Sequence, residues 1–525
     1  MKSKVTDISG ALDLIRDGDF VAVTAAGGVG YPEYVVMKLE ERFVERKSPG
    51  GLTLYSAGGH GDPKGVHCWD SRFAHPGFLK RHVCTHPKVV PELRAMIENN
   101  EFEAYALPQG VFNQLYRCVA AGQPGLLTRI GMGTYIDPRQ DGGKLNESTK
   151  EDMVSLIEIE GKEWLFFKSF PVTVALIRGT YADEKGNVTI DHEALKLEML
   201  EAAMAAKAAG GKVIVQVEGV VRNGTLKAKD VVVPGELVDA VVVTEDPEQC
   251  HRQSADPGYN PYLSGEARGL AAAAASPKPL VSVDDVMCRR AVFELFPGAI
   301  VNLGVGVGAG TGVAAAIEGV ADKLNFTLEL GVFGGMPLPP PNFGVSMNPE
   351  SFVSPSSMFD FYHGGNLDIT VLGAAEVDRG GNVNVSKFAG HPNGQGGFID
   401  ISQTAKKVIF CTTLRTKGFE AEVSDGKLHI QKEGQIPKFV DKAEQITFNG
   451  AVAYEAGHDV YYITERAVFK IEKEGLVLLE IAPGVDLEKD VLRQMGFAPA
   501  VSPNLKTMDE RIFRPGKMGC FGHFG

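Results

Sequence analysis

The stretch Phe326-Thr327-Leu328-Glu329-Leu330-Gly331-Val332-Phe333-Gly334-Gly335 determines how we interpret the fold of this chain. Its apolar start predicts a buried parallel strand. The strand ends on a carboxylate that leads into a glycine-rich turn, where backbone can approach a ligand closely. Ligands of open α/β sheets bind outside the carboxyl ends of strands. Glu329 is therefore a candidate for chemistry, although an acid that only caps or solvates a turn would also follow a strand in this way.

The same order of elements recurs along the chain. Apolar runs at 20–24, 52–55 and 299–303 predict strands that end in glycine turns, and amphipathic segments at 32–43 and 283–296 predict helices. Strands that alternate with helices form parallel sheets with right-handed crossovers. The sequence therefore predicts the α/β class.

Two parts of the chain match each other. Residues 183–188 and 378–383 both follow the pattern Asp-x-x-Gly-Asn-Val, and in both cases Lys-Val-Ile begins 25 residues after the asparagine. A repeat of this kind predicts two similar open, mainly parallel-sheet domains. In this alignment Thr327-Leu328-Glu329 falls on Thr53-Leu54-Tyr55, so the acid has no counterpart in the first copy. An acid kept in only one copy favours a functional role for Glu329.

The chain of 525 residues is longer than one hydrophobic core supports. We expect a first domain at 1–255 with an irregular insertion at about 131–170, and a second domain at 281–505. Proline, glycine and an alanine run predict a linker at 256–280. Residues 506–525 are expected to be a tail of unknown role.

Composition excludes some partners. The net charge of −13 and the pI near 5.5 argue against nucleic acid. Seven scattered cysteines fit free thiols in a reducing compartment. We found no apolar run long enough for a membrane span and no signal peptide. We therefore expect a cytoplasmic protein without a membrane partner.

Glycine-rich loops provide two candidate anion sites. Gly304-x-Gly306-x-x-Ala309 follows a predicted strand and precedes a helix, and Glu329 comes 25 residues after Gly304. This matches a dinucleotide fingerprint, although such a turn serves any phosphate or oxyanion. The second loop, residues 393–398, can form an anion nest for a developing oxyanion. Two such loops around one carboxylate favour acyl chemistry over hydride transfer.

A metal site is a weaker possibility. His82, Cys84 and His86 alternate and would share one face of a strand, with His67 and Cys68 upstream. Zinc needs three or four converging ligands, whereas polar residues on a half-exposed strand explain the same pattern. We expect no metal site.

Several motifs together resemble the family I CoA-transferases, most closely the fused single-chain propionate or acetate CoA-transferase type. They are the Glu329 turn, residues 394–398, Pro108-Gln109-Gly110 and residues 481–485. The resemblance runs nearly end to end. It implies two similar domains joined by a linker, with the active site at their interface. It also implies a homo-oligomer, either a dimer or a tetramer.

The resemblance also implies residue roles. Glu329 would be the nucleophile, and Gln109 would position the incoming carboxylate. Oxyanion or CoA binding is implied for Asn393, Gly394, Gly396, Gly397, Gly304, Gly306 and Gly308. The acyl pocket would include Gly27, Gly28, Leu330, Phe333 and Met336. The last three are bulkier than the family pattern, which leaves the choice between short and longer or aromatic acids open.

The implied reaction transfers CoA from an acyl-CoA to a free carboxylic acid, with acids of the acetate and propionate type as the default. It would proceed by ping-pong kinetics through an acyl-glutamyl anhydride and a glutamyl-CoA thioester. No tightly bound cofactor is expected, and coenzyme A is a co-substrate. Three alternatives stay open: an NAD-dependent oxidoreductase built on residues 304–329, an acyl-CoA hydrolase, and a non-catalytic ligand sensor.

Overall fold

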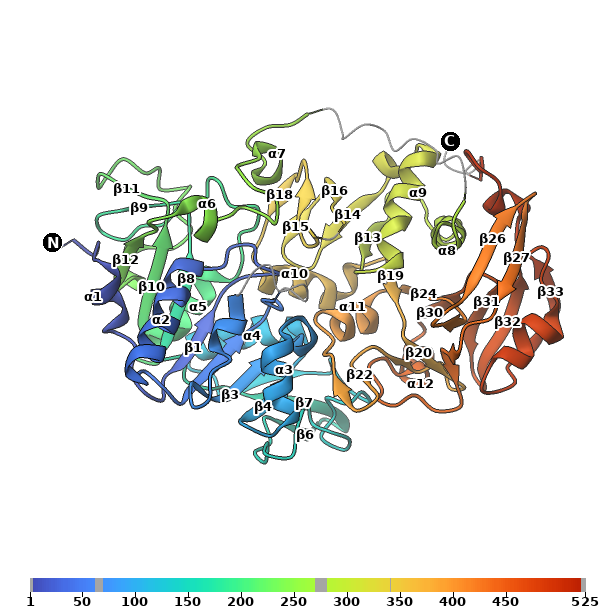
Figure 1. Ribbon diagram of the computed structural model, residues 1–525, viewed down its shortest axis with the longest axis horizontal. Coiled ribbons are helices and arrows are strands. Elements are labelled where there is room, and N and C mark those ends of the chain that lie inside the picture. The colour runs from blue at the N-terminus through green and yellow to red at the C-terminus, as the bar shows by residue number, and fades with distance from the viewer. Residues whose placement is uncertain (1–2, 62–68, 270–280, 340, 521–525) are drawn as a thin grey trace.

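The computed structural model describes residues 3–61, 69–269, 281–339 and 341–520. His67, Cys68, the second part of the predicted linker (270–280) and the last tail residues (521–525) lie outside this part. Within it, no helix is long and apolar enough to cross a membrane. Two α/β halves lie side by side, the first coloured blue to green and the second yellow to red (Figure 1). The predicted fold class is confirmed.

The first half is built on a seven-stranded parallel sheet in the order β12-β10-β8-β1-β2-β3-β4. The strands are β1 (Phe20–Val23), β2 (Leu52–Ser56), β3 (Leu79–Cys84), β4 (Glu103–Ala106), β8 (Val174–Arg178), β10 (Lys212–Val217) and β12 (Ala240–Val243). The helices are α1 (Ile8–Leu12), α2 (Glu33–Arg46), α3 (Pro91–Glu98), α4 (Gln109–Ala120), α5 (Met199–Ala208), α6 (Pro247–Cys250) and α7 (Pro261–Ser264). Helices α1, α2 and α3 pack on one face of this sheet, and α4 and α5 on the other.

The second half has a ten-stranded sheet in the order β18-β15-β14-β13-β19-β24-β30-β31-β32-β33. Its strands are β13 (Ile300–Leu303), β14 (Asn325–Leu328), β15 (Val332–Phe333), β18 (Ser351–Phe352), β19 (Ile369–Gly373), β24 (Lys407–Cys411), β30 (Asp459–Ile463), β31 (Ala467–Glu472), β32 (Gly475–Ile481) and β33 (Ala500–Thr507). The helices are α8 (Val283–Val292), α9 (Gly310–Glu318), α10 (Pro355–Phe361), α11 (Phe398–Thr404) and α12 (Gly450–Glu455). Strands β13, β14, β19, β24 and β30 are parallel.

The two sheets share a five-stranded core, because the order β12-β10-β8-β1-β2 matches β30-β24-β19-β13-β14. Ala22 of β1 and Asn302 of β13 occupy equivalent positions. In the first half the strand register leads from Ala22 across β8 to the valine of Lys-Val-Ile, and in the second half it leads from Asn302 across β19 to the valine of the second Lys-Val-Ile. Their partners on the next strand are Tyr55 and Thr327. The internal repeat is therefore a structural duplication.

This pairing corrects the predicted alignment by two residues. Thr327, rather than Glu329, is the counterpart of Tyr55, so Glu329 corresponds to Ala57. The sequence motif that we matched lay far from this strand, and the connections in between differ in length. Glu329 nevertheless still has no acidic counterpart in the first half.

The repeated Asp-x-x-Gly-Asn-Val turn folds in the same way in both halves. One carboxylate oxygen of Asp183 or Asp378 accepts hydrogen bonds from the backbone amides two and four residues later. The other oxygen accepts from the asparagine side chain at 2.8 or 3.0 Å. The aspartate therefore organises each turn.

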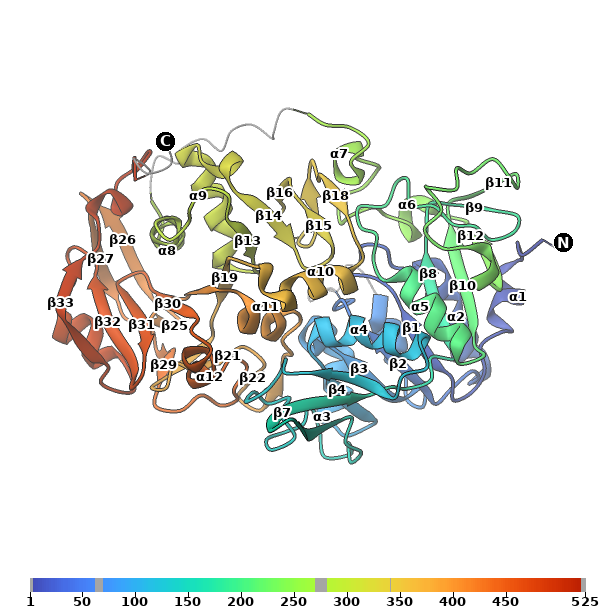
Figure 2. The same ribbon diagram turned by 180° about the vertical axis from the view of Figure 1, so that it is seen from behind.

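Two segments are more regular than the sequence indicated. The predicted insertion contains an antiparallel hairpin, β6 (Val154–Ile159) and β7 (Lys162–Lys168), which pairs with β5 (Gly125–Thr128) at the edge of the first half (Figures 1 and 2). Residues 506–520 do not form a separate tail, because Met508, Ile512, Phe513 and Met518 are buried in the core of the second half. The Arg289 guanidinium binds four backbone carbonyls of this segment.

Shorter strands form small sheets around the two cores. In the first half they are β9 (Tyr181–Asp183) and β11 (Gly219–Val221). In the second half they are β16 (Met336–Pro337), β17 (Ser346–Met347), β20 (Glu376–Asp378), β21 (Val383–Asn384), β22 (Lys387–Phe388), β23 (His391–Pro392), β25 (Arg415–Thr416), β26 (Glu420–Ser424), β27 (Lys427–Lys432), β28 (Ile436–Pro437) and β29 (Phe439–Val440).

The halves meet where α4 packs against α10 and α11, near the centre of Figures 1 and 2. Apolar residues that flank Glu329 belong to the core of the first half, among them Leu328, Leu330 and Val332. Polar contacts also cross the boundary, such as the one from Arg117 to Ser357 at 2.9 Å. Glu329 therefore lies at the interface between the two halves.

Candidate active site

Glu329 follows the last residue of β14, at the carboxyl end of the strand. It is 8% exposed. Asn302 on the neighbouring strand β13 donates a hydrogen bond from Nδ2 to Oε2 of Glu329 at 3.0 Å. Burial raises the pKa of the Glu329 carboxyl above its usual range, and hydrogen bonds from its own backbone and from Asn302 offset part of this rise. The result is a desolvated carboxyl group with one neutral side-chain donor among the described residues, Asn302.

A small polar network holds the Asn302 amide. The Thr370 hydroxyl lies 3.4 Å from Oδ1 of Asn302, which leaves Nδ2 directed at Glu329. On the other side, the hydroxyls of Thr327 and Tyr362 are 2.8 Å apart, and the Tyr362 hydroxyl lies 3.5 Å from the same Nδ2. The burial of this network keeps the amide in one orientation.

The loop of residues 393–397 lies against Glu329. A β-carbon on Gly397 would be 3.5 Å from Cγ of Glu329 and 3.3 Å from the Phe359 ring. Four amides of the loop are already engaged: those of Gln395 and Gly396 donate to the Thr85 carbonyl, and those of Asn393 and Gly394 donate to the Ser386 carbonyl. The Gly397 amide has no hydrogen-bond partner within the described ranges. Of the predicted oxyanion donors in this loop, Gly397 is therefore the one with an unused N–H.

Gln109 is the contribution of the first half. Gln109 is the first residue of α4, and its backbone N–H donates a hydrogen bond to the Gly396 carbonyl at 3.1 Å. The backbone N–H of Gly110 donates a hydrogen bond to the Asp400 carboxylate at 3.1 Å. A β-carbon on Gly110 would clash with Asp400 and Phe359. The Gln109 side chain is buried, and no hydrogen bond ties it to the rest of the described chain. A buried amide next to the glycine loop is available to a ligand.

The turn of Gly304, Gly306 and Gly308 begins two residues after Asn302, one strand away from Glu329. The Gly304 amide donates to the Val371 carbonyl at 2.9 Å, and a β-carbon on Gly308 would be 2.7 Å from the same oxygen. Gly306 has φ +103° and ψ −147°, a region that is essentially restricted to glycine. Helix α9 begins at Gly310, directly after the motif. The structure brings this turn beside the site but not onto the carboxylate.

The five predicted acyl-pocket residues do not form one wall. Leu330 packs into the core of the first half, whereas Met336 packs against the core that contains α9. The Phe333 ring meets Phe361 edge-on at 5.3 Å between centroids. A β-carbon on Gly28 would overlap the Trp69 ring, and Gly27 donates to the Gly58 carbonyl in the first half. Leu330 and Phe333 are the members that flank the Glu329 strand directly.

The predicted metal-ligand candidates have other partners. Nε2 of His82 lies 3.0 Å from the Ser56 hydroxyl, and the Cys84 thiol contacts the Tyr105 carbonyl. Burial lowers the pKa of His82 and of His86 to about 4. His86 follows β3 and packs against Gly396. The described ranges hold no group of three histidine, cysteine or acidic side chains that could bind a metal.

Sequence reasoning missed Asn302, Thr327, Tyr362 and Phe359. One of them carried a signal, because Asn302 is the single polar residue in the apolar run Ile300-Val301-Asn302-Leu303. A buried polar side chain in a strand interior needs a partner. That rule could have indicated Asn302, although not which acid it meets.

Comparisons with known proteins agree with this geometry. A family model described as coenzyme A transferase matches residues 5–244. The acetate CoA-transferase YdiF of Escherichia coli K12 is 44% identical over 512 residues, which are 97% of this chain and 95% of that protein. The caffeate CoA-transferase of Acetobacterium woodii is 42% identical over 512 residues, 96% of each chain.

Solved structures give the same result. The crystal structure of an acyl-CoA transferase, the YdiF apoenzyme of Escherichia coli O157:H7, has a TM-score of 0.92 and 41% identity, and it covers 99% of this chain and 97% of its own. A structure described as a thioester complex of that enzyme with CoA has a TM-score of 0.91 and 40% identity, with the same coverage.

Proposed function

We propose that this chain, which belongs to the coenzyme A transferase family and transfers CoA from an acyl-CoA to a carboxylic acid, works through covalent intermediates on Glu329. The observation that supports this assignment is the carboxylate itself. It is buried between the two halves, holds a hydrogen bond from Asn302 at 3.0 Å and lies against Gly397. The equivalent position in the first half is Ala57.

The proposed reaction has four covalent steps. The Glu329 carboxylate attacks the thioester carbonyl of the acyl-CoA, which releases CoA thiolate and leaves an acyl-glutamyl anhydride. The thiolate attacks the glutamyl carbonyl, which gives a glutamyl-CoA thioester and frees the first acid. The second acid's carboxylate attacks this thioester to form a new anhydride and thiolate. The thiolate then attacks the new acyl carbonyl and releases the new acyl-CoA and Glu329. Dividing one CoA exchange into steps that pass through covalent enzyme intermediates is covalent catalysis.

The surrounding residues support these steps physically. A carboxylate is a weak nucleophile that becomes stronger when water is removed, and the same exclusion protects the anhydride from hydrolysis. Asn302 would orient the attacking oxygen, and the Gly397 amide would stabilise the developing oxyanion. Gln109 would position the incoming carboxylate through its unused amide. The glycine turn at 304–308 would approach the CoA.

We further propose acids of the acetate and propionate type as substrates, with coenzyme A as a co-substrate and no tightly bound cofactor. Relatives of nearly equal identity are named for acetate and for caffeate. An aromatic acid is therefore the second class to test, and Leu330 and Phe333 would supply its apolar wall. The family resemblance also supports a homo-oligomer, a dimer or tetramer, which light scattering can measure.

Intact-protein mass spectrometry after mixing with acetyl-CoA tests the mechanism. We expect an adduct equal in mass to CoA less one water, and peptide mapping should place it on Glu329. The isosteric Glu329→Gln variant is the control and should form none. Failure of acetyl-, propionyl- and caffeoyl-CoA to give the adduct would overturn the proposal. Release of CoA without an acceptor acid would instead indicate the hydrolase, and tight NAD binding the oxidoreductase.

A further inference from the structure

The proposed site takes Gln109 from the first half and the glycine loop 393–397 from the second, so the two halves must stay aligned there. Two backbone groups in the first turn of α4 make this connection. The Gln109 N–H donates to the Gly396 carbonyl, and the Gly110 N–H donates to the Asp400 carboxylate, each at 3.1 Å. The second bond depends on the orientation of a side chain, and the groups that hold that side chain take no part in the four covalent steps.

Asp400 is fully buried in the first turn of α11, and both of its carboxylate oxygens are engaged. Oδ2 accepts the hydrogen bond from the Gly110 N–H, and Oδ1 lies 3.1 Å from Nε2 of His363. His363 belongs to the short helical segment Tyr362–Asn366, which follows α10. A buried carboxylate is costly unless hydrogen bonds satisfy it. His363 therefore stabilises Asp400 in the orientation that Gly110 needs.

The other nitrogen of His363 determines the direction of these hydrogen bonds. Nδ1 lies 3.1 Å from Nε2 of Gln114 on α4, and the same amide nitrogen donates to Oδ1 of Asp360 at 2.7 Å. An amide nitrogen can only donate, so Nδ1 of His363 is an acceptor. Nε2 of His363 then carries the hydrogen and donates it to Asp400.

These contacts close into a cycle that crosses the boundary between the halves twice. The members of this hydrogen-bond cycle are Gly110, Asp400, His363 and Gln114. Gly110 and Gln114 are about one turn apart on α4, so the cycle fixes the first turn of that helix. One turn further along α4, Arg117 forms an ion pair with Asp360 and extends the connection to the second half.

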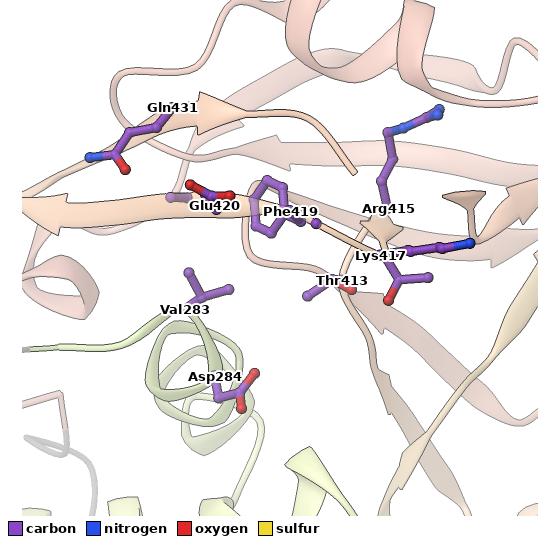
Figure 3. A pocket seen from close by; sticks show the side chains of 11 residues that line it. Val283, Asp284, Thr413, Arg415, Lys417, Phe419, Glu420 and Gln431 are labelled. Carbon is purple, nitrogen blue, oxygen red and sulfur yellow. The ribbon is translucent and has the colours of Figure 1, made fainter. Parts of the chain in front are cut away.

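The hydrogen-bond cycle is made of protein atoms that approach one another closely. A β-carbon on Gly110 would be 2.4 Å from Oδ1 of Asp400, so a glycine is needed at this position. The cavity of about 540 Å³ beside α8 is different, because Lys417 and Gln431 line open space there (Figure 3). The cycle is therefore suited to holding two protein segments together rather than to binding a ligand.

The segment that carries His363 also contacts the surroundings of the nucleophile. The hydroxyl of the preceding residue, Tyr362, belongs to the polar network of Asn302 beside Glu329. Two consecutive residues of one segment thus reach two different parts of the site. Tyr362 contacts the network of the nucleophile, and His363 connects through Asp400 to the helix of Gln109.

We propose that His363 and Asp400 are positioning residues of the exchange reaction. Through the hydrogen-bond cycle they hold α4 so that the Gln109 side chain meets the acid whose carboxylate attacks the glutamyl-CoA thioester and displaces CoA thiolate. The inference rests on the proposed function, since it takes Gln109 to position the incoming carboxylate. A loosened α4 would weaken binding of the acid. Water could then compete for the thioester, releasing CoA and restoring the Glu329 carboxylate.

Two substitutions of His363 test the proposal. His363→Leu removes both hydrogen bonds of the imidazole, whereas His363→Gln keeps one donor and one acceptor. Each protein is converted to its glutamyl-CoA form with acetyl-CoA, freed of acetate and mixed with propionate. We expect His363→Leu to raise the dissociation constant of propionate about tenfold, the value of one hydrogen bond to a charged group. It should also increase the share of thioester lost to water, and His363→Gln should restore both values toward the wild type.

Two further variants complete the test. His391→Leu is the matched control, because His391 also contacts a carboxylate of the other half, Glu98, at 2.9 Å, but at an exposed position. It should leave both values unchanged. Gln114→Leu breaks the same cycle from α4 and should raise the propionate constant about threefold; it decides the question if His363→Leu does not fold. An unchanged constant in the cycle variants, an equal rise in His391→Leu, or no recovery in His363→Gln would overturn the proposal.

The same measurements separate this proposal from the covalent mechanism. If the wild type forms no glutamyl-CoA adduct, the covalent mechanism fails, and the KM for propionate in steady-state exchange then tests the cycle with the same variants. If the adduct forms and the propionate values do not differ among the variants, only the positioning role of His363 and Asp400 fails.

Discussion

The two halves of this chain share a five-stranded core and differ where chemistry is proposed. In the second half β14 ends just before Glu329, and the chain turns back at once as antiparallel β15. In the first half β2 ends before Ala57, and the next strand, β3, returns parallel to it. The residue of the first half that is equivalent to Asn302 is Ala22. The second half thus carries the acid Glu329 and its hydrogen-bond donor Asn302, while the first half covers them and supplies Gln109.

The halves therefore show how a duplicated domain can divide its roles. The core and the Asp-x-x-Gly-Asn-Val turn are kept in both copies, because each sheet needs them to fold. The strand-end residues differ: Glu329 accepts a hydrogen bond from Asn302, whereas Ala57 packs in the core of the first half.

The largest expected effect comes from making the second half resemble the first at the strand end. Glu329→Ala removes the nucleophile, and exchange between acetyl-CoA and propionate should fall by about 10⁴-fold or more. Glu474→Ala, in an exposed turn of the same half, is the control and should retain activity. Thermal unfolding should show that both variants fold. Exchange at the wild-type rate in Glu329→Ala would mean that the two halves do not differ in this role.

Both halves contain buried acids, and one of those in the first half, Glu198, lacks a donor like Asn302 among the described residues. Burial raises the pKa of Glu198 to about 8, and its Oε1 has no hydrogen-bond partner among the described residues. Because its folded pKa lies above the ordinary value of 4.5, its contribution to stability is complete below pH 4.5 and is lost as the pH rises to 8.

Glu198→Gln should abolish this pH dependence. We expect the variant to be more stable than the wild type at pH 8.5 by about 4 kcal/mol, and to be similar to it at pH 4.5. Urea unfolding at several pH values measures the difference, and Glu201→Gln on the same helix is the control. A wild-type stability that stays level from pH 5 to 8 would contradict the prediction.

Asn302→Ala replaces the hydrogen-bond donor to Glu329 by alanine, the residue that the first half has at the equivalent position. The loss of the donor to the charged carboxylate should lower kcat about tenfold to a hundredfold. It should also move the acidic limb of the pH profile upward, because the hydrogen bond favours the ionised form. Thr370→Val, which acts only through the Asn302 carbonyl, should give a smaller change in the same direction. An unmoved acidic limb would show that Asn302 does not tune Glu329.

The smallest expected effect tests what the halves share. Asp183→Ala and Asp378→Ala each remove the acceptor of three local hydrogen bonds. Each should cost about 2 kcal/mol of unfolding free energy and leave the KM for acetyl-CoA unchanged. Urea unfolding and steady-state kinetics measure the two effects. Costs that differ widely between the halves would show that the repeated turn does not play the same part in both.

The sequence by itself determined the local features. Apolar runs that end in glycine turns identified the core strands, the repeated turn identified the duplication, and Glu329 was placed correctly at a strand end. These features follow from the side-chain alternation of strands and from the backbone freedom of glycine, both of which act over a few residues.

Only the tertiary structure decided which residues meet. The register of β2 and β14 made Ala57 the counterpart of Glu329, and the pairing of β13 with β14 brought Asn302 to the carboxylate. The packing of the halves placed Gln109 at the glycine loop and separated Leu330 from Met336. Such contacts join segments far apart in the chain. They depend on strand register and on how two separately patterned surfaces fit, and local periodicity specifies neither.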